Sequence, residues 1–516
     1  MRKSEIRIER IRKWGILVAF LLGLDIGTSG VKALLMADDG TVRGSVTVEY
    51  PLYSPRPGWT EQNPEDMWQA SVEAVRQVLE KCAVKGSDVM GVGLSGQMHS
   101  SVFLDEAYQV IRPAILWNDT RTSGKCQAIR AALDPEMLFS EVCNPVLEGF
   151  TLPKVVWLRD NEPENYEKLR WLVLPKDYVR FRLTGELAME VSDAAGMLMM
   201  NIRGRKWSLP VLQGLQISPE ILPPIIQSAE VAGTITAEVA ELTGLAEGTP
   251  VVGGGADNAC GAVGSGVVKQ GRGMISLGTS GVVLAHLVEP RLVRTGTVHM
   301  FNSCVPDEFY MMGVTLSAGL SLSWFRSVLG DSAQSYDQLT AQAAESPAGS
   351  QGLLFLPYLT GERTPHGDGD ARGSFVGLSS AHSRGDLTRA VLEGVAFAFR
   401  DSVELLRSAG WNGTALRGIG GGLKSALWKE IIASATGLAV ERLNIDEGPA
   451  FGAAVLAGVG AGVFANVPEA SDAVVKVVDA VEPNPVWAKT YEELYGLYRG
   501  LYPALKESFH RLAELQ

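Results

Sequence analysis

Two copies of the turn sequence Gly-Thr-Ser-Gly-Val are the residues whose types and spacing most clearly indicate chemistry. The first copy runs from Gly27 to Val31 and the second from Gly278 to Val282. Each lies between two apolar runs, which predicts a hairpin turn between two strands. The hydroxyl and backbone N–H groups of such a turn form a concave set of donors that suits phosphate oxygens. One copy alone is more simply an ordinary hairpin, but the pair predicts a duplicated fold that grips a polyphosphate from both sides.

Only the first copy is preceded by an acid, Asp25. A carboxylate beside a phosphate is repulsive unless a hard cation lies between the two groups. Asp25 therefore predicts a site for a nucleotide with Mg²⁺.

The composition is that of a turn-rich α/β enzyme. The chain has 516 residues, 46% of them hydrophobic, 20% charged, with 57 glycines, and this length predicts roughly two to four domains. The formal net charge of −12 argues against nucleic acid or an anionic membrane as the main partner. Any bound phosphate must then be held by local donors and a metal.

The cysteines and the start of the chain bear on compartment. The five cysteines are scattered, never in CxxC spacing, and indicate neither a disulfide framework nor a zinc site. Residues 1–13 are basic and residues 14–22 apolar, which imitates a secretory signal. However, the apolar run leads directly into the strand that carries Asp25, and it is too short to span a bilayer. We predict a cytoplasmic protein with a leader at 1–20.

The sequence between and after the two turns predicts further helices and strands. Asn63 and Pro64 predict the capped start of a helix. Gly91, Gly93 and Gly96 match the dinucleotide fingerprint by letters, but they lie within an apolar run followed by a further strand at 99–104, so we interpret the match as chance. The stretch 418–425 is a near miss to the P-loop, which disfavours a Walker-type NTPase.

Three further elements stand out. Three glycines before Asp257 predict a tight strand–helix turn with Asp257 as the helix N-cap. A long helix is predicted at 386–408, and Ser425 is predicted to cap a helix that runs to Gly437. An amphipathic helix or helix pair, interrupted at Pro503, is predicted to close the chain.

From about Leu21 to Phe509 the chain resembles the FGGY carbohydrate kinases. The matching motifs are LLGLDIGTSGVK (21–32), GWTEQNPEDMW (58–68), SGQMH (95–99), ILWNDTR (115–121), LPKDYVRFRLTGE (174–186), GGADNACGAVG (254–264), SLGTSGV (276–282), LPYLTGERTPH (356–366), LEGVAFA (392–398) and GIGGGLKSALWKEIIASATG (418–437).

This resemblance implies an α/β fold of two actin-like (ribonuclease H-like) domains with the active site in the cleft between them. The implied organisation is the leader at 1–20, an N-terminal domain at 21–266 with the sugar site and catalytic base, a C-terminal nucleotide-binding domain at 267–465, and a helical tail at 466–516 packed on the core.

The resemblance also implies residue roles. Asp257 would be the general base and Asp25 would assist the Mg²⁺–ATP site. The implied sugar ligands are Met98, His99 and Asn258. The residues expected to contact ATP are Thr28, Ser29, Gly278, Thr279, Ser280, Gly421, Gly422 and Lys424. Two positions depart from the family pattern: Lys424 stands where Arg is common, and Ala256 where many relatives have Gly.

The implied reaction is ATP-dependent phosphorylation of D-xylulose at its 5-hydroxyl, with Mg²⁺ as cofactor and a homodimer left open. A kinase for another sugar or polyol, such as ribulose, gluconate or glycerol, is the first alternative. A non-catalytic actin-like module is the second, but it needs a polymer surface or a peptide-binding domain, and no segment is spare for either.

Overall fold

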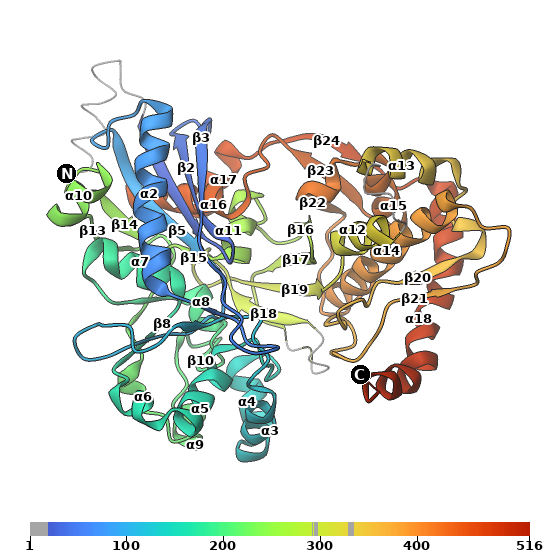
Figure 1. Cartoon of the computed structure of the whole chain (residues 1–516). Helices are drawn as coiled ribbons and strands as arrows, with labels where there is room; N and C mark the ends of the chain where they lie inside the picture. Colours follow the sequence, from blue (N-terminus) through green and yellow to red (C-terminus); the bar gives the residue numbers. More distant parts are fainter. Residues whose placement is uncertain (1–18, 292, 294–297, 329–334, 516) are drawn as a thin grey trace.

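The computed structural model describes residues 19–291, 293, 298–328 and 335–515. Two seven-stranded sheets organise the chain. Strands from the first half of the sequence, blue to green in Figure 1, build one sheet, and strands from the second half build the other. The predicted leader, 1–20, lies outside the described residues except for its last two positions, and the first strand begins at Phe20.

The first sheet has the order β13-β14-β5-β1-β2-β3, with β15 beside the end of β5. β1 pairs antiparallel with β2, and β2 with β3, whereas β5 runs parallel to both β1 and β14. The bounds are β1 (Phe20–Ile26), β2 (Gly30–Ala37), β3 (Val42–Glu49), β5 (Val89–Gly96), β13 (Val231–Thr234), β14 (Pro250–Val252) and β15 (Gly255–Ala256).

The second sheet has the order β18-β19-β17-β16-β22-β23-β24. Its bounds are β16 (Gly273–Leu277), β17 (Gly281–Leu287), β18 (His299–Asn302), β19 (Phe309–Thr315), β22 (Ala415–Ile419), β23 (Ala439–Leu443) and β24 (Val477–Val481). The run β19-β17-β16-β22-β23 repeats β3-β2-β1-β5-β14 in order and in strand direction. The predicted duplication is therefore confirmed, and each Gly-Thr-Ser-Gly turn joins the first hairpin of its sheet.

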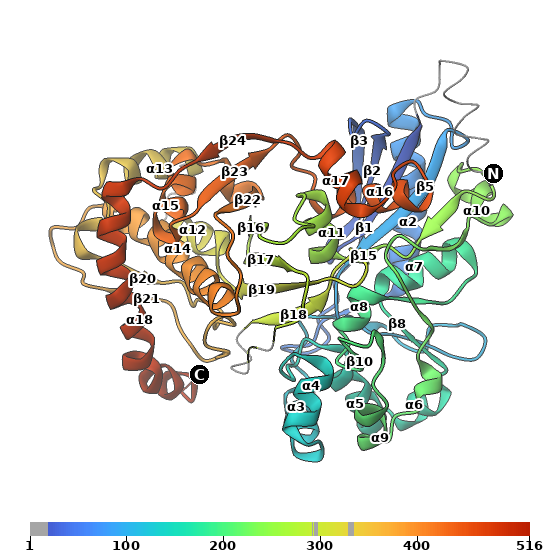
Figure 2. The ribbon, with the colours of Figure 1, turned by 180° about the vertical axis from the view of Figure 1, so that it is seen from behind.

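Helices from both halves of the chain cover the first sheet. On one face lie α2 (Pro64–Cys82) and α7 (Pro175–Thr184). On the other face lies α16 (Gly448–Gly460), which belongs to the second half of the sequence and packs on β1 and β5; Figure 2 shows it beside these strands. A Cβ on Gly93 would stand 2.0 Å from the carbonyl oxygen of Ala453. The glycines that imitate a dinucleotide fingerprint thus include one that lets a helix backbone lie directly on the sheet.

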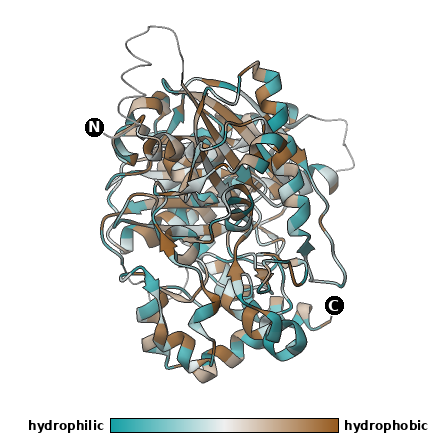
Figure 3. Ribbon diagram, turned by 90° about the vertical axis from the view of Figure 1, so that its left-hand side faces the viewer, coloured by the Kyte–Doolittle hydropathy of each residue, from teal (hydrophilic) through white to brown (hydrophobic). Residues whose placement is uncertain are grey.

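The second sheet carries α14 (Arg384–Ser408) and α15 (Ala426–Thr436), which pack on each other. Further helices around them are α12 (Gly319–Val328), α13 (Tyr336–Glu345) and α18 (Pro485–Ala513). The last of these is one helix with Pro503 inside it rather than a pair. The helix α11 (Asp257–Gly264) packs on α16 between the two halves. Coloured by hydropathy in Figure 3, brown concentrates in the inner strands, as a buried sheet with helices on its faces requires.

Shorter elements complete each half. Those of the first half are β4 (Glu61–Gln62), β6 (Val102–Leu104), β7 (Ala114–Ile115), α3 (Ser123–Ala132), α4 (Pro135–Val142), α5 (Thr151–Asn161), α6 (Pro163–Lys168), β8 (Trp171–Val173), β9 (Met189–Glu190), α8 (Val191–Ala195), β10 (Met200–Asn201), β11 (Lys206–Trp207), α9 (Leu209–Gly214), the 3-10 turn Pro219–Ile221, β12 (Ile225–Ile226) and α10 (Ala237–Thr243). Those of the second half are the 3-10 turns Ser350–Gly352 and Gly421–Lys424, β20 (Leu354–Leu356), β21 (Ser374–Val376) and α17 (Val467–Val474).

Local chemistry explains where several elements begin. The Asn63 side chain accepts a hydrogen bond from the N–H of Glu65, and Ser425 caps α15 by accepting from the N–H of Trp428, both as predicted. The strand predicted at 99–104 begins only at Val102, because His99 has a φ of 67° and breaks the extended conformation. Across the described ranges, no helix combines the length and apolar character needed to cross a membrane.

Candidate active site

Two carboxylates meet at one edge of the first sheet. Asp25 lies near the end of β1, and Asp257 follows directly after β15. Both strands pair with β5 in parallel, and both Asp25 and Gly255 are in register with Ser95. The carboxyl ends of these strands therefore present the two acids side by side, at the kind of sheet edge where α/β folds place their ligands.

Asp25 is the acid with an unsatisfied oxygen. Its Oδ1 is buried and has no hydrogen-bond partner among the described residues. Burial raises the pKa of Asp25, while Ser95 and the charge of Lys32 lower it. An orphaned carboxylate oxygen at this edge fits a hard cation, which takes oxygen ligands.

Asp257 has the charge state of a base. Burial, with the charge of Asp25 as the next cause, raises the pKa of Asp257 to about 7. Its Oδ1 accepts hydrogen bonds from the backbone N–H of Asn258 at 2.6 Å and from Asn258 Nδ2 at 2.9 Å. These bonds hold the carboxylate in place and leave Oδ2 without a protein donor in the described part of the chain. A general base works best with a pKa near the operating pH.

Asp257 is not the helix N-cap. That position belongs to Ala256, which still pairs with Gly96 in β15, so Asp257 is the first residue of α11 and the predicted position is wrong by one residue. The exchange of Gly for Ala at 256 leaves the turn intact, because Ala256 has a φ of −54°.

A buried polar network fixes the turn that carries Asp257. Ser192 Oγ accepts from the N–H of Ala256 at 2.9 Å and donates to Glu190 at 2.7 Å. Arg180 donates to the carbonyl oxygen of Gly253 at 2.9 Å. The turn is thus held from both ends by side chains that cannot reach solvent.

The charges of this network lie under the turn. Lys176 lies 2.8 Å from Asp177 and 3.2 Å from Asp193, and Arg180 lies 2.6 Å from Asp177. Burial raises the pKa of Asp193 well above its usual value, against the attraction of Lys176. The two cations thus lie among the buried acids Asp177, Glu190 and Asp193, as buried charges require.

The first hairpin turn has its carbonyl groups engaged and its N–H groups open. The carbonyl oxygen of Gly27 accepts from Tyr50 and from Gln97, and that of Thr28 accepts from Gln62 at 2.6 Å. The N–H groups of Thr28 and Ser29 have no acceptor among the described residues. This is the arrangement of donors that an anionic oxygen needs.

The second turn repeats the arrangement. The carbonyl oxygen of Gly278 accepts from the N–H of Gly319 at 2.9 Å, and that of Thr279 accepts from the N–H of Leu320 at 3.0 Å. In the described chain the N–H groups of Thr279 and Ser280 again have no acceptor. The duplicated sequence therefore folds into two turns with the same donors directed outward.

A cavity of about 470 Å³ adjoins the second turn. Five of the predicted ATP contacts line it together: Gly278, Thr279, Gly421, Gly422 and Lys424. Ser280 is exposed and outside its lining. Apolar and polar side chains from α12, α13 and α15 close the cavity: Leu320, Leu322, Tyr336, Asp337, Thr340 and Trp428. Sequence reasoning did not assign these six residues, because their motifs carry no local signal of a base pocket.

His99 is an acceptor. Its Nδ1 lies 2.6 Å from the carbonyl oxygen of Gly196, which can only accept, so Nδ1 carries the proton and Nε2 presents a lone pair. Burial, reinforced by the charge of Lys154, lowers the pKa of His99 to about 3. Lys154 Nζ donates to the carbonyl oxygens of His99, at 3.0 Å, and Gly149, at 2.6 Å. The ring is held neutral and oriented.

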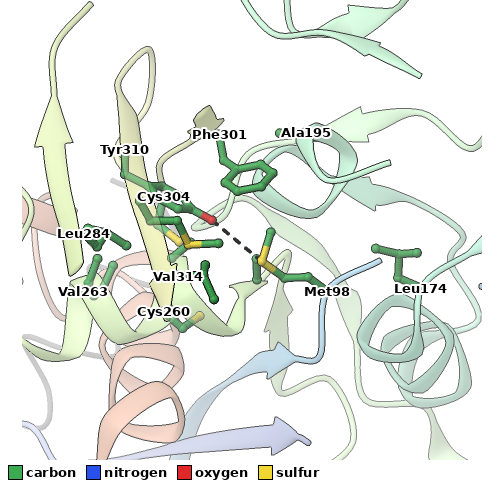
Figure 4. Packing of buried hydrophobic residues seen from close by; sticks show 14 of the residues in the cluster. Met98, Leu174, Ala195, Cys260, Val263, Leu284, Phe301, Cys304, Tyr310 and Val314 are labelled. Carbon is green, nitrogen blue, oxygen red and sulfur yellow. Dashed lines mark hydrogen bonds between the residues drawn. The ribbon is translucent and has the colours of Figure 1, made fainter. Parts of the chain in front are cut away.

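Met98 connects the two halves beside the base. Asn258 Nδ2 and the hydroxyl of Tyr310 each lie 3.9 Å from the sulfur of Met98, and Figure 4 shows the Tyr310 contact. Tyr310 belongs to β19 of the second sheet and is buried. Met98 thus lies against Asn258, which hydrogen-bonds Asp257, and His99 follows Met98 directly in the chain. Tyr310 was not predicted, because its strand has the pattern of a buried core strand.

Comparison with known proteins identifies the relatives of this arrangement. Models of the FGGY family of carbohydrate kinases match residues 20–264, for the N-terminal domain, and 273–461, for the C-terminal domain. A xylulose kinase of Bacillus subtilis is 42% identical over 95% of this chain and 97% of its own length. An L-xylulose/3-keto-L-gulonate kinase of Escherichia coli is 30% identical over 96% and 99%. A crystal structure titled as a xyloylose kinase from Brucella ovis superposes with a TM-score of 0.88 at 37% identity, over 95% and 99%.

Proposed function

The chain belongs to the FGGY family of carbohydrate kinases, and we propose that it transfers the γ-phosphoryl group of ATP to the 5-hydroxyl of D-xylulose. The sugar is taken from the curated relatives named xylulose kinase, which align over most of this chain at about two-fifths identity. A non-catalytic actin-like role is thereby set aside.

One observation carries the reaction: a carboxyl group with a pKa near 7, Asp257, lies at the sheet edge beside Asp25 and the strand that leads into the first donor turn. A sugar hydroxyl is too weak an acid to attack phosphorus unaided. Asp257 Oδ2 takes its proton as the new O–P bond forms and the bond to the ADP oxygen breaks, and the proton is later released to water.

The rest of the site supplies position and charge. His99 Nε2 accepts a hydrogen bond from a sugar hydroxyl, and Asn258 lies beside the same sugar with Met98 as its apolar floor. The open N–H groups of Thr28, Ser29, Thr279 and Ser280 are donors for the phosphate oxygens.

The orphaned Oδ1 of Asp25 fits Mg²⁺. When bound there, Mg²⁺ would supply charge neutralisation between this carboxylate and the phosphate oxygens. We assign Gly421, Gly422 and Lys424 to the nucleotide, on the ground that they share a cavity with the second turn.

We propose a cytoplasmic location, which five unpaired cysteines favour. A homodimer stays a prediction, and light scattering of the purified protein would test it.

The decisive experiment is a coupled assay of ADP release with D-xylulose, L-xylulose, D-ribulose, gluconate and glycerol. D-xylulose should give the highest kcat/KM. A higher value for another sugar would refute the substrate assignment and leave the kinase assignment standing. Asp257→Asn, prepared in parallel, controls for contaminating kinases. L-xylulose is included because the relative that is 30% identical is named an L-xylulose/3-keto-L-gulonate kinase.

A further inference from the structure

Arg363 is a cation that the reaction described above does not use. It lies in the loop between β20 and β21, in the second half of the chain. Its backbone is fixed, because its N–H donates to the Glu362 carboxylate at 2.8 Å and the N–H of Thr364 donates to the carbonyl oxygen of Val314 in β19 at 3.0 Å. The side chain therefore starts from a rigid point on the second sheet.

The guanidinium reaches the wall of the sugar site in the first half. Arg363 Nη2 lies 3.9 Å from the point where a Cβ on Gly149 would stand. The carbonyl oxygen of Gly149 is held by Lys154, which also holds the carbonyl oxygen of His99. Arg363 thus approaches the segment that orients His99.

Among the residues that the structure describes, no group accepts from the guanidinium of Arg363. Arg363 is partly buried, and its N–H groups have no hydrogen-bond acceptor among the described residues. Glu362, and less strongly Glu148, act on the guanidinium through charge without a hydrogen bond to it. An arginine withdrawn from water normally pairs with a carboxylate or a carbonyl, so five open donors at this wall indicate an oxygen-bearing ligand.

The two histidines near Arg363 do not act as further cations. The charge of Arg363 lowers the pKa of both His99 and His299, after burial as the main cause. Both rings are neutral, and they flank Phe150 with centroid distances of 4.4 and 5.7 Å. The wall offers one planar cation, two neutral imidazoles and an aromatic face, which suits an uncharged polyhydroxy ligand.

We propose that Arg363 is a specificity-determining residue that donates to the carbonyl and hydroxyl oxygens at the C1–C2 end of the ketose, while Asp257 meets the other end. This rests on the proposed function, because it assumes a ketose in the site. Since Arg363 comes from the second half of the chain and the base from the first, only a sugar with the carbonyl end engages both halves through these two residues. A planar fork of two N–H groups matches adjacent oxygens, which an ammonium group does not.

The test compares D-xylulose with xylitol, which has the same carbon chain without the carbonyl group. Arg363→Met should raise the KM for D-xylulose by about 10- to 100-fold, on the order expected when a hydrogen bond to a charged donor is lost. The inhibition constant of xylitol as a competitor should change by less than about threefold, because its tetrahedral C2 does not hold the C2 oxygen in the plane that the fork requires. The KM of Arg363→Lys for D-xylulose should lie between that of Arg363→Met and that of wild type.

Controls separate this role from a structural one. Arg372→Met removes an arginine of the same loop that donates only to the loop's own backbone, and it should leave both constants unchanged. The KM for ATP and the acid limb of the pH profile should be the same in all variants, and calorimetric titration of D-xylulose without nucleotide should repeat the loss of binding.

Two results would overturn the proposal. Equal weakening of D-xylulose and xylitol would mean that Arg363 does not recognise the carbonyl end. A fall in kcat with an unchanged sugar KM would mean that it acts on the phosphoryl group instead. If wild-type protein prefers a substrate without a ketone, the proposed function fails first, and the sugar panel shows this before any variant is made.

Discussion

The acid limb of the pH profile tests the role of Asp257 most directly. Burial and the charge of Asp25 raise the pKa of Asp257 to about 7 from 3.8. A base must be ionised to accept a proton, so kcat/KM for the sugar should fall as the pH drops through 7. A group with this pKa is about nine-tenths ionised at pH 8 and about one-tenth at pH 6, so the loss between them should be about tenfold.

His99 and Lys154 cannot produce this limb. The pKa of His99 is about 3, so its ring is neutral throughout the range. The pKa of Lys154 is lowered to about 7, but Lys154 loses its charge and its grip on the His99 carbonyl as the pH rises. Deprotonation of Lys154 therefore lowers activity as the pH rises, whereas protonation of Asp257 lowers it as the pH falls.

The assay is initial-rate ADP release at limiting sugar and saturating MgATP from pH 5.5 to 9. Asp257→Asn keeps the shape and loses the basicity, so kcat should fall by about 10²–10⁴-fold and the residual rate should lack the acid limb. Sugar and ATP should still bind.

The stability of the same variant gives a second test of the raised pKa of Asp257. The folded protein binds the proton of Asp257 more tightly than the unfolded chain does. The contribution of Asp257 to the free energy of unfolding is therefore greatest below pH 4 and is lost as the pH rises through 7. Asp257→Asn should thus be at least as stable as wild type at pH 8 in thermal unfolding. Near-normal turnover in this variant, or an acid limb that persists in it, would remove Asp257 from the mechanism.

Four further outcomes are expected. His99→Ala should lower kcat/KM for D-xylulose by one to three factors of ten, as for a lost buried polar contact of about 1–3 kcal/mol, with little change in the KM for ATP; an equal loss for ATP would contradict a sugar role. Ser192→Ala should lower kcat by about tenfold or more through misplacement of Asp257, whereas Ser140→Ala, an exposed control, should not. Phosphate release from ATP without sugar should be slow, because closure around the sugar excludes water, and a rate near turnover would refute this. Deleting residues 1–18 should leave activity intact, because β1 begins at Phe20; an insoluble product would instead mean that the leader packs on the core.

The hairpins and caps could be predicted because their determinants are local. Each Gly-Thr-Ser-Gly turn is set by its own residues and flanking strands, and the same holds for Asn63 and Ser425. Because the turn sequence occurs twice, the duplication of the fold could also be predicted. The meeting of Asp25 and Asp257 at one edge was not predicted from the pattern, because it depends on both strands pairing in parallel with β5.

The partners of the site residues could not be predicted, because they come from distant parts of the chain. Tyr310 and Arg363 reach the sugar site from the second half, and the ion cluster of Lys176 and Asp193 is assembled only by the fold. Likewise α16 is apolar on all sides, which indicates burial but does not say on which sheet.

The packing of α11 on α16 limits how the two halves can move. A Cβ on Gly452 of α16 would stand 1.9 Å from the carbonyl oxygen of Cys260 in α11, so the two backbones touch. Sliding along α16 by about one turn would bring Val455 or Leu456, which lie three and four residues further on, into that contact, and a close-packed interface cannot accept this. We therefore expect any closure to be a rotation about this helix pair rather than a shear. Because Asp257 begins α11, the base stays with the first sheet, and we expect the second turn, with its phosphate donors, to be the part that moves toward it.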